Sequence, residues 1–401
     1  MKYVVVLCDG MADTPVEALG GKTPMELAQK PNMDALAQTS TVGMVRTVDD
    51  GLSPGSDVAN LSVMGFDPLI CYTGRSPLEA VSMGLTLGEA DTAIRCNVVT
   101  ISEEEENYED KTIIDHSSGE ISTEDAAVLV EALKEGLQKE GYEFYVGTSY
   151  RHLLLQKDGK VVELTPPHDI LTKRIGEYLP TDEVLREMMK KSYDILVNHP
   201  INVKRKEQGL NPANSAWFWG AGTRPALQSF GEKTGKRGAM ISAVDLLKGI
   251  AVGSGMDNIE VEGANGGLHT NYTGKMEAAV KALLEDKYDF VYIHVEAPDE
   301  MGHQGLVNEK IQAIENIDKF IVTPLIEKMN ASGEDYRILV LPDHPTPIAI
   351  RTHTGGTIPY LLYDSTKQLG NNAGYDECVG EASGIMKKNG HQLMEYLLCE
   401  R

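Results

Sequence analysis

The sequence is poor in cysteine and in positive charge. Neither the odd number of its five cysteines nor their spacing indicates a disulfide framework; they are Cys8, Cys71, Cys96, Cys378 and Cys399. Reduced thiols are typical of the cytoplasm, where we expect the protein to be. Its 37 lysines and arginines stand against 60 aspartates and glutamates, a net charge of −23. Because such a surface repels phosphate backbones and anionic membranes, we expect neither nucleic acid nor a membrane as a partner.

Long hydrophobic runs are also missing. No apolar stretch approaches the roughly 18 residues of a membrane-spanning helix. The opening Lys2-Tyr3-Val4 leads directly into a predicted strand, so we expect no targeting leader. With 41% apolar and 24% charged residues, the composition is that of a globular protein. A chain of 401 residues suggests roughly two or three domains.

Short apolar runs alternate with helical patterns in the first and last parts of the chain. Strands are predicted at 4–8, 41–48, 238–241, 290–295 and 338–341, and helices at 23–39, from 56, and at 243–251, 276–284 and 308–329. The middle differs, with antiparallel-type strands at 93–101 and 144–156, helices at 123–139 and 182–196, and an acidic loop at 103–106. We therefore predict an α/β fold with a mostly parallel sheet covered by helices on both faces. This discontinuous core (1–90 and 200–401) would carry an inserted, smaller α+β domain (91–199).

Side chains able to bind a metal or a phosphoryl group stand where the predicted strands end. They are Asp9, Asp299, His303, Asp343, His344 and His353, with Ser56 at the start of a predicted helix. Ligands of parallel sheets collect at the carboxyl ends of strands, so we expect these residues to meet. Asp299 and His303 are four apart and would share one side of a helical turn. Carboxylates and imidazoles together suit Mn, Zn or Mg, and two ions about 4 Å apart would clamp a phosphoryl group during transfer.

Each of these residues also has an ordinary structural explanation. Ser56 alone fits a helix N-cap, and a single aspartate after a strand is usually a turn residue. The Asp299–His303 spacing arises by chance on any helix, and His353 alone fits a surface loop. Their joint occurrence at the ends of separate strands favours a site. In such a site Ser56 is the candidate nucleophile, because a helix N-terminus favours an anion and a bound metal lowers the pKa of a hydroxyl.

Short motifs along the whole chain carry a family resemblance. They include Leu7-Cys8-Asp9-Gly10, Gly21-Lys22-Thr23-Pro24, Pro54-Gly55-Ser56-Asp57, Tyr72-Thr73-Gly74-Arg75, Arg95-Cys96-Asn97, Tyr150-Arg151-His152, Trp217-Phe218-Trp219-Gly220, Ser242-Ala243-Val244-Asp245 and Pro342-Asp343-His344. With these motifs the chain resembles the archaeal-type cofactor-independent phosphoglycerate mutases, metalloenzymes of the alkaline phosphatase superfamily.

This resemblance implies two divalent metal ions (Mn, Zn, Co or Mg) and a phosphoserine intermediate. One ion would be held by Asp9, Ser56, Asp343 and His344, and the other by Asp299, His303 and His353. Ser56 would take the phosphoryl group and return it to the other hydroxyl of glycerate. The reaction interconverts 2-phosphoglycerate and 3-phosphoglycerate, in glycolysis and gluconeogenesis, without bisphosphoglycerate. Because glycerate must be retained and water excluded, the inserted domain would act as a lid.

The resemblance also implies cationic contacts to the substrate. A phosphate and a carboxylate call for arginine forks, so the candidates are Arg151 and His152, then Arg75 and Arg95, with Lys275 in the core domain. An ordinary surface salt bridge would explain these cations as well.

Other functions remain open at this point. A homoserine kinase-like branch of the same family would share the metal site, as would a metal-dependent phosphomonoesterase. A sulfatase is disfavoured because Ser56 is followed by Asp57-Val58-Ala59. A non-catalytic metal-binding module would leave the Ser56 hydroxyl without a purpose.

Overall fold

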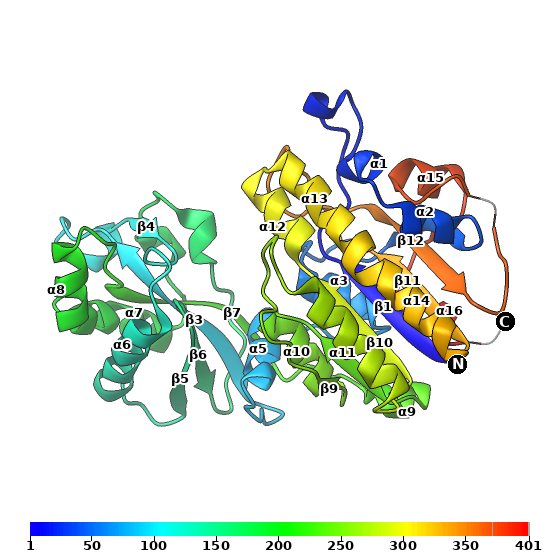
Figure 1. The fold of residues 1–401 in the computed structure, drawn as a ribbon. Helices are drawn as coiled ribbons and strands as arrows, with labels where there is room; N and C mark the ends of the chain where they lie inside the picture. The colour runs from blue at the N-terminus through cyan, green and yellow to red at the C-terminus, as the bar shows by residue number, and fades with distance from the viewer. Residues whose placement is uncertain (371, 400–401) are drawn as a thin grey trace. The chain divides into compact units, whose positions relative to one another are not determined.

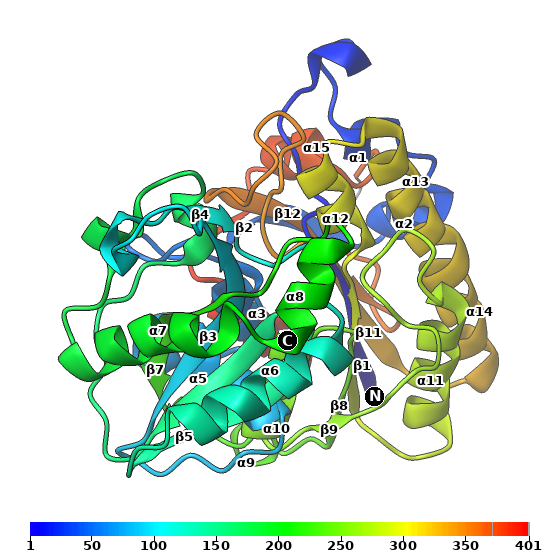
Figure 2. The ribbon, with the colours of Figure 1, turned by 90° about the vertical axis from the view of Figure 1, so that its left-hand side faces the viewer.

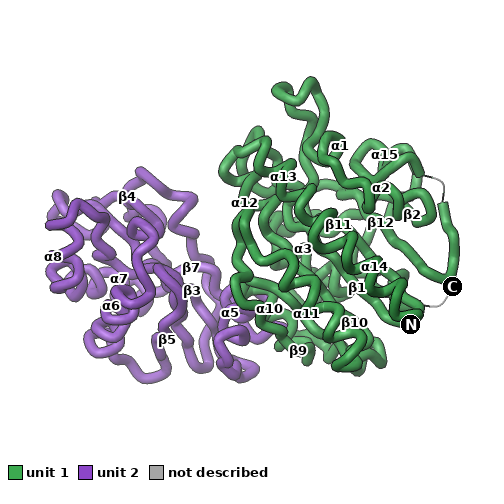
Figure 3. Tube along the Cα trace, in the orientation of Figure 1, with its two compact units in different colours: residues 1–72, 226–401 green, residues 73–225 purple. Residues whose placement is uncertain are grey.

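The chain folds into two compact units, which Figure 3 colours separately. The computed structural model describes residues 1–370 and 372–399. Unit 1 comprises residues 1–72 and 226–401, and unit 2 comprises residues 73–225. These boundaries differ from the expected ones near residues 90 and 200. Helix α5 (Arg75–Ser82) and strand β7 (Ser215–Thr223) belong to unit 2, because β7 pairs with β3 (Thr92–Ile101) and α5 packs on both strands.

Unit 1 is built, over the described residues, on an eight-stranded sheet in the order β13-β2-β12-β11-β1-β10-β8-β9. Its strands are β1 (Lys2–Cys8), β2 (Thr41–Arg46), β8 (Gly238–Ile241), β9 (Asp257–Asn258), β10 (Phe290–Val295), β11 (Tyr336–Leu341), β12 (Thr357–Asp364) and β13 (Met386–Lys387). Only β12 runs antiparallel to its neighbours, β11 and β2. The predicted mostly parallel sheet is therefore confirmed. Strand β12 was not predicted, since Pro359 interrupts its pattern and proline is unusual inside a sheet.

Helices cover both faces of this sheet (Figure 1). They are α1 (Pro24–Leu27), α2 (Pro31–Ala37), α3 (Ser56–Val63), α4 (Pro68–Cys71), α9 (Phe230–Thr234), α10 (Asp245–Gly253), α11 (Tyr272–Leu284), α12 (Ala297–Gln304), α13 (Val307–Ile317), α14 (Thr323–Ser332), α15 (Glu377–Ala382) and α16 (Leu393–Leu398), with 3-10 turns η1 (Glu17–Leu19) and η6 (Gly390–Gln392). Val4 and Val6 pack with α2, α11, α13 and α14 in one core. Alternate strand residues point the other way, where the Tyr292 hydroxyl donates to Oδ1 of Asn60 on α3 at 2.6 Å.

Two predicted helices depart from regular α-helix in the structure. The helix expected at 23–39 breaks into α1 and α2 before Pro31, and α1 begins with a capping box at Thr23, where the predicted helix starts. The helix expected at 308–329 is continuous but passes through a π turn, η5 (Asp318–Val322), between α13 and α14. Pro324 follows this turn, and the wider π geometry relieves the clash of its ring with the preceding turn.

Unit 2 is an antiparallel sheet of β3, β4 (Ile113–Asp115), β5 (Tyr142–Thr148), β6 (Arg151–Gln156) and β7. Its other elements are α5, α6 (Thr123–Gly136), α7 (Glu183–Leu196) and α8 (Pro200–Glu207), with 3-10 turns η2 (Tyr108–Asp110), η3 (Pro167–Ile170) and η4 (Ile175–Tyr178). Helices α6 and α7 pack on the sheet, in front of it in Figure 2. The strand expected at 144–156 is a β5–β6 hairpin that turns at Ser149, whose φ is 55°.

The expectations of reduced thiols and of no membrane-spanning helix can be compared with the structure. All five cysteines, each within the described part, carry free thiols. Across residues 1–370 and 372–399, no helix combines the length and the apolar character needed to cross a bilayer.

Candidate active site

The predicted metal-binding residues all lie in unit 1, at the carboxyl edge of its sheet. Strands β1, β10 and β11 run parallel, so the segments that follow them leave the sheet at one edge. Asp9 follows β1 directly, and α12, which carries Asp299 and His303, follows β10. Asp343 and His344 follow β11. The sequence placed each of these residues at a strand end, and the parallel pairing brings those ends together.

The first group joins Asp9, Asp343 and His344 around Ser56. One ligand atom from each of the first three lies within 4.8 Å of the others. Ser56 Oγ lies 3.5 Å from Oδ2 of Asp9 and 3.2 Å from Nε2 of His344. Ser56 is not a helix cap, because Gly55 holds the N-cap position and Ser56 is the first residue of α3. Its hydroxyl is therefore directed to the cluster and not to the helix backbone.

The second group joins Asp299, His344 and His353, again within 4.8 Å. His303 adjoins it, with Nε2 at 3.2 Å from Oδ2 of Asp299 and 2.9 Å from Nε2 of His353. The helical turn predicted for Asp299 and His303 is confirmed by α12. His344 belongs to both groups, so the two groups are contiguous.

Hydrogen bonds orient the histidines toward the cluster. Nδ1 of His303 lies 3.0 Å from the carbonyl oxygen of Arg351, which only accepts, so this nitrogen donates. The Thr346 hydroxyl donates to Oδ1 of Asp299 at 2.5 Å and can accept from Nδ1 of His344 at 3.3 Å. A metal binds the neutral form of a histidine, and in that form the lone pair of both rings is on Nε2, the atom that faces the cluster.

Asp343 is held by residues that the sequence analysis did not single out. Asn60 donates to its Oδ2 at 2.9 Å, and the backbone N–H of Gly10 donates to its Oδ1 at 3.1 Å. Asn60 stands one helical turn after Ser56 on α3, in the segment that continues the motif beginning at Pro54.

The charges in the cluster fit a divalent cation. Oδ1 of Asp9 is buried and has no hydrogen-bond partner among the residues that the structure describes. Burial raises the pKa of Asp9 well above its ordinary value, and the carboxylates of Asp343 and Asp299 add to the effect. Burial also acts to raise the pKa of Asp299, but hydrogen bonds with His303 and His353 lower it well below its ordinary value. Crowded carboxylates, imidazoles and an unpartnered oxygen are the donors that Mn, Zn or Mg accept.

Lys275, expected to contact substrate, is buried on α11. Its Nζ donates to the carbonyl oxygen of His294 at 2.8 Å. Burial lowers the pKa of Lys275 to about 8. The contact places this cation beside β10, and its role toward substrate stays a prediction.

The other predicted substrate residues lie in unit 2. Glu79 accepts from Arg75 at 3.1 Å and from Arg95 at 2.6 Å, and the Arg95 guanidinium lies 4.8 Å from the ring centre of Trp219. The sequence placed Trp219 in a motif but did not predict its contact with Arg95, because that contact depends on the β3–β7 pairing. The Arg151 guanidinium lies over the ring of its neighbour Tyr150, 5.5 Å from the centre.

His152 points to the opposite face of the sheet from Arg151. It is 1% exposed and sits opposite Cys96 in the β3–β6 pairing, so its side chain enters the core of unit 2. Successive strand residues point to opposite faces, which separates His152 from Arg151. Nδ1 of His152 accepts from the N–H of Gly147 at 3.1 Å. This placement favours a structural role for His152.

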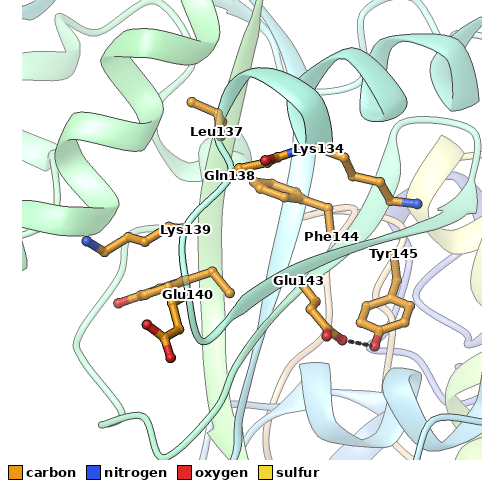
Figure 4. A pocket seen from close by; sticks show the side chains of 9 residues that line it. Lys134, Leu137, Gln138, Lys139, Glu140, Glu143, Phe144 and Tyr145 are labelled. Atoms are coloured by element: carbon orange, nitrogen blue, oxygen red, sulfur yellow. Dashed lines mark hydrogen bonds between the residues drawn. The ribbon is translucent and has the colours of Figure 1, made fainter.

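A cavity of about 660 Å³ in unit 2 is unrelated to these residues (Figure 4). It is lined by Lys134, Leu137, Gln138, Lys139, Glu140, Tyr142, Glu143, Phe144 and Tyr145. Its lining carries both positive lysines and negative glutamates, and the Tyr145 hydroxyl donates to Glu143. None of the predicted site residues lines it, so the cluster in unit 1 is the better candidate site.

Comparisons with known proteins identify a family to which the chain is similar. A family model described as 2,3-bisphosphoglycerate-independent phosphoglycerate mutase matches residues 37–202. The chain is 49% identical over 383 residues to the 2,3-bisphosphoglycerate-independent phosphoglycerate mutase of Methanosarcina barkeri, with 94% of each chain covered. It is 45% identical over 402 residues to that of Methanothrix thermoacetophila, with 100% of each covered. A solved structure of a Pyrococcus horikoshii protein is similar, with a TM-score of 0.82, 27% identity, and 100% and 98% of the two chains covered.

Proposed function

The chain belongs to the family of 2,3-bisphosphoglycerate-independent phosphoglycerate mutases, and we propose that it interconverts 2- and 3-phosphoglycerate by passing the phosphoryl group through Ser56. The observation that carries the proposal is the position of the Ser56 hydroxyl, between Asp9 and His344 at the start of α3. No feature of the described residues favours either of the other functions considered, a homoserine kinase or a phosphomonoesterase. Both are possible outcomes of the test below.

Two divalent ions would complete the site. Asp9, Asp343 and His344 with Ser56 would hold one, and Asp299, His303 and His353 the other. When bound, such ions act as Lewis acids toward phosphoryl oxygens and favour the ionised form of a serine hydroxyl.

The chain's own residues orient the nucleophile and receive the anion. Asp9 and His344 flank the Ser56 hydroxyl, while Thr346 fixes the ring of His344 through Nδ1. The first N–H groups of a helix have no partner within it, so the start of α3 favours the negative phosphoryl group. The Asp57 carboxylate at the same helix end accepts from the Tyr72 hydroxyl at 2.6 Å and from its neighbour Val58 N–H at 2.9 Å. Those bonds fix the position of the Asp57 carboxylate, which takes up one N–H of this helix end.

Unit 2 supplies the remaining candidates for substrate recognition. Its arginines Arg75, Arg95 and Arg151 are suited to the carboxylate and phosphate of phosphoglycerate. The expected role of this unit as a lid stays part of the proposal.

A coupled assay tests the function. The Mn-loaded protein is given 3-phosphoglycerate and enolase without bisphosphoglycerate, beside a phosphate-release assay and a homoserine-plus-ATP reaction. We expect phosphoenolpyruvate to form without free phosphate. Free phosphate alone would indicate a phosphomonoesterase, and phosphohomoserine alone a kinase.

Two serine variants on α3 test the nucleophile. Ser56→Ala should reduce turnover by at least about 10⁴-fold while Mn binding persists, because the group that takes the phosphoryl is gone. The matched control is Ser62→Ala, since Ser62 is buried on the same helix and its hydroxyl has no hydrogen-bond partner among the described residues. Substantial turnover by Ser56→Ala, or equal losses in both variants, would contradict the proposal.

A further inference from the structure

His294 is a buried histidine at the carboxyl edge that the mechanism above leaves without a role. It is 0% exposed and lies in the penultimate position of β10, level with Leu7 of β1. Its Nε2 lies 2.9 Å from Oδ2 of Asp9, and its Nδ1 lies 3.1 Å from Oγ of Ser242. Ser242 follows β8 directly, so the contacts cross three adjacent strands in line.

The hydrogens in this row can be assigned one by one. A metal ligand such as Asp9 carries no proton and only accepts, so Nε2 of His294 must donate to it. With Nε2 donating, Nδ1 of the neutral imidazole is an acceptor, and it faces Oγ of Ser242. The Ser242 hydroxyl then donates to Nδ1 and itself accepts from the N–H of Val244 at 3.0 Å. Every donor in the row therefore has one acceptor.

The row divides the two oxygens of Asp9 between two tasks. Oδ2 is occupied by His294, whereas Oδ1 is buried and has no hydrogen-bond partner among the residues that the structure describes. A hydrogen bond to one oxygen fixes the rotation of the Asp9 carboxylate about its Cβ–Cγ bond. The free oxygen then keeps one direction, toward His344 Nε2 at 3.6 Å.

The backbone of His294 is anchored as well. The Lys275 ammonium donates to its carbonyl oxygen at 2.8 Å, and β10 is paired on both sides. The imidazole is thus attached to a rigid strand and not to a loop, which suits a residue that sets the direction of another group.

We propose that His294, supported by Ser242, is a positioning residue that fixes the carboxylate of Asp9 so that Oδ1 is presented to the divalent cation. This inference rests on the proposed function, since it assumes a cation at the Asp9 group. Hydrogen-bond partners of metal ligands contribute about 10–100-fold to metal affinity, because they reduce the freedom of the ligand and set its charge.

Metal affinity measured by calorimetry with Mn²⁺ tests the proposal. We expect His294→Phe, which keeps the ring but not the hydrogen bond, to bind Mn²⁺ about 10–100-fold more weakly than the unaltered protein. His294→Gln, whose amide can donate from a similar position, should recover most of the affinity. Ser242→Ala should cause a smaller loss, and Ser254→Ala should cause none, since Ser254 is also a buried serine but donates to the carbonyl of Ala251.

Unfolding of each variant in the presence of a chelator separates packing from metal binding. If His294→Phe folds and binds Mn²⁺ as tightly as the unaltered protein, the proposal is wrong and His294 only fills the core. If that variant does not fold, the Mn²⁺ affinity of Ser242→Ala and the ¹⁵N NMR spectrum of histidine-labelled protein test the proposal instead. The spectrum of the metal-loaded protein should show His294 protonated on Nε2 and not on Nδ1, and the opposite tautomer would overturn the proposal.

The proposed function can fail independently. An unaltered protein that binds no Mn²⁺ would contradict the metal site itself, whatever the variants do. Normal Mn²⁺ binding and mutase activity with no effect of His294→Phe would contradict only the role of His294.

Discussion

At the scale of single residues, the site depends on the close approach of two backbone segments as well as on the candidate ligands. Gly10 follows Asp9 with a φ of +61°, and its N–H donates to Asp343. A Cβ at this position would lie 2.5 Å from Oδ1 of Asp299 and 2.6 Å from Oγ1 of Thr346. A residue with no side chain is therefore required between the segments that carry the metal-binding groups.

Gly10→Ala is expected to impair metal binding beyond its effect on the backbone. The positive φ alone costs about 1 kcal/mol, and displacement of Asp299 should weaken Mn²⁺ binding by at least about tenfold. Gly20→Ala is the matched control, because Gly20 has a φ of +68° and a Cβ there would meet nothing within 4 Å. Calorimetry on both variants checks this, and equal Mn²⁺ affinities would contradict it.

His152 is expected to make unit 2 less stable in acid. Burial lowers its pKa to about 3, with Arg95 adding to the effect, whereas in the unfolded chain it should be near 6.5. Between these values the unfolded chain binds the additional proton, so the free energy of unfolding falls as the pH falls through this window. Above about pH 6.5 the residue has no effect on the pH dependence. The total loss should approach about 4 kcal/mol at pH 3.

His152→Asn should remove this pH dependence. The Asn oxygen can still accept from Gly147, but it does not titrate. Urea unfolding between pH 7 and pH 4 should therefore show a shallower decline in the variant. His269→Asn, at an exposed position, should decline like the unaltered protein. A variant at position 152 with an unchanged slope would show that this histidine is not the cause.

At the scale of elements, one buried ion pair connects the segments that carry the site. The ammonium of Lys310, on α13, lies 2.8 Å from Oδ2 of Asp13 and 2.8 Å from the carbonyl oxygen of Thr346. It also donates to the carbonyl oxygen of Ala12 at 3.3 Å. One side chain thereby ties together the loop after β1, the loop after β11 and the helix that follows α12.

Lys310→Met is expected to lower the free energy of unfolding by about 3–5 kcal/mol, because it leaves Asp13 buried and unpaired. The double variant Lys310→Met/Asp13→Leu removes both charges and should be more stable than the single variant. Lys328→Met, at an exposed position on α14, should change little. Guanidinium unfolding measures all three, and a double variant less stable than the single one would contradict this explanation.

Elements also differ in how far the sequence predicts them. The apolar runs of β1, β10 and β11 and the residues that end them were predicted, because burial on both faces leaves a continuous hydrophobic run. Strand β12 was missed at Pro359, and the π turn at Asp318 was read as ordinary helix. In both places the surrounding structure imposes a conformation that the local sequence does not favour.

At the scale of the whole molecule, the anionic chain brings three buried carboxylates of unit 1 together at the proposed metal site. Asp9, Asp299 and Asp343 are each at most 8% exposed, in a chain of net charge −23. Without a cation their mutual repulsion opposes the packing of the three segments that carry them.

Metal binding should therefore protect unit 1 locally. Hydrogen exchange with and without Mn²⁺ is expected to slow in residues 9–13, 297–304 and 343–353, since a bound ligand stabilises the state that binds it. Exchange in the α6 and α7 segments of unit 2 should not change. Protection confined to unit 2, or none in the three segments, would contradict the position of the metal site.

The sequence by itself determined the strands β1, β2, β8, β10 and β11 of the core sheet, the polar residues at strand ends, and the motifs that identify the family. These are local properties, set by burial and by the residue types that phosphoryl transfer needs. Only the tertiary structure decided that His344 serves both ligand groups, that His294 faces Asp9, and that His152 enters a core. Those facts depend on strand pairing and on which face each side chain takes. A shift of one residue in register would reverse them without altering the local sequence pattern.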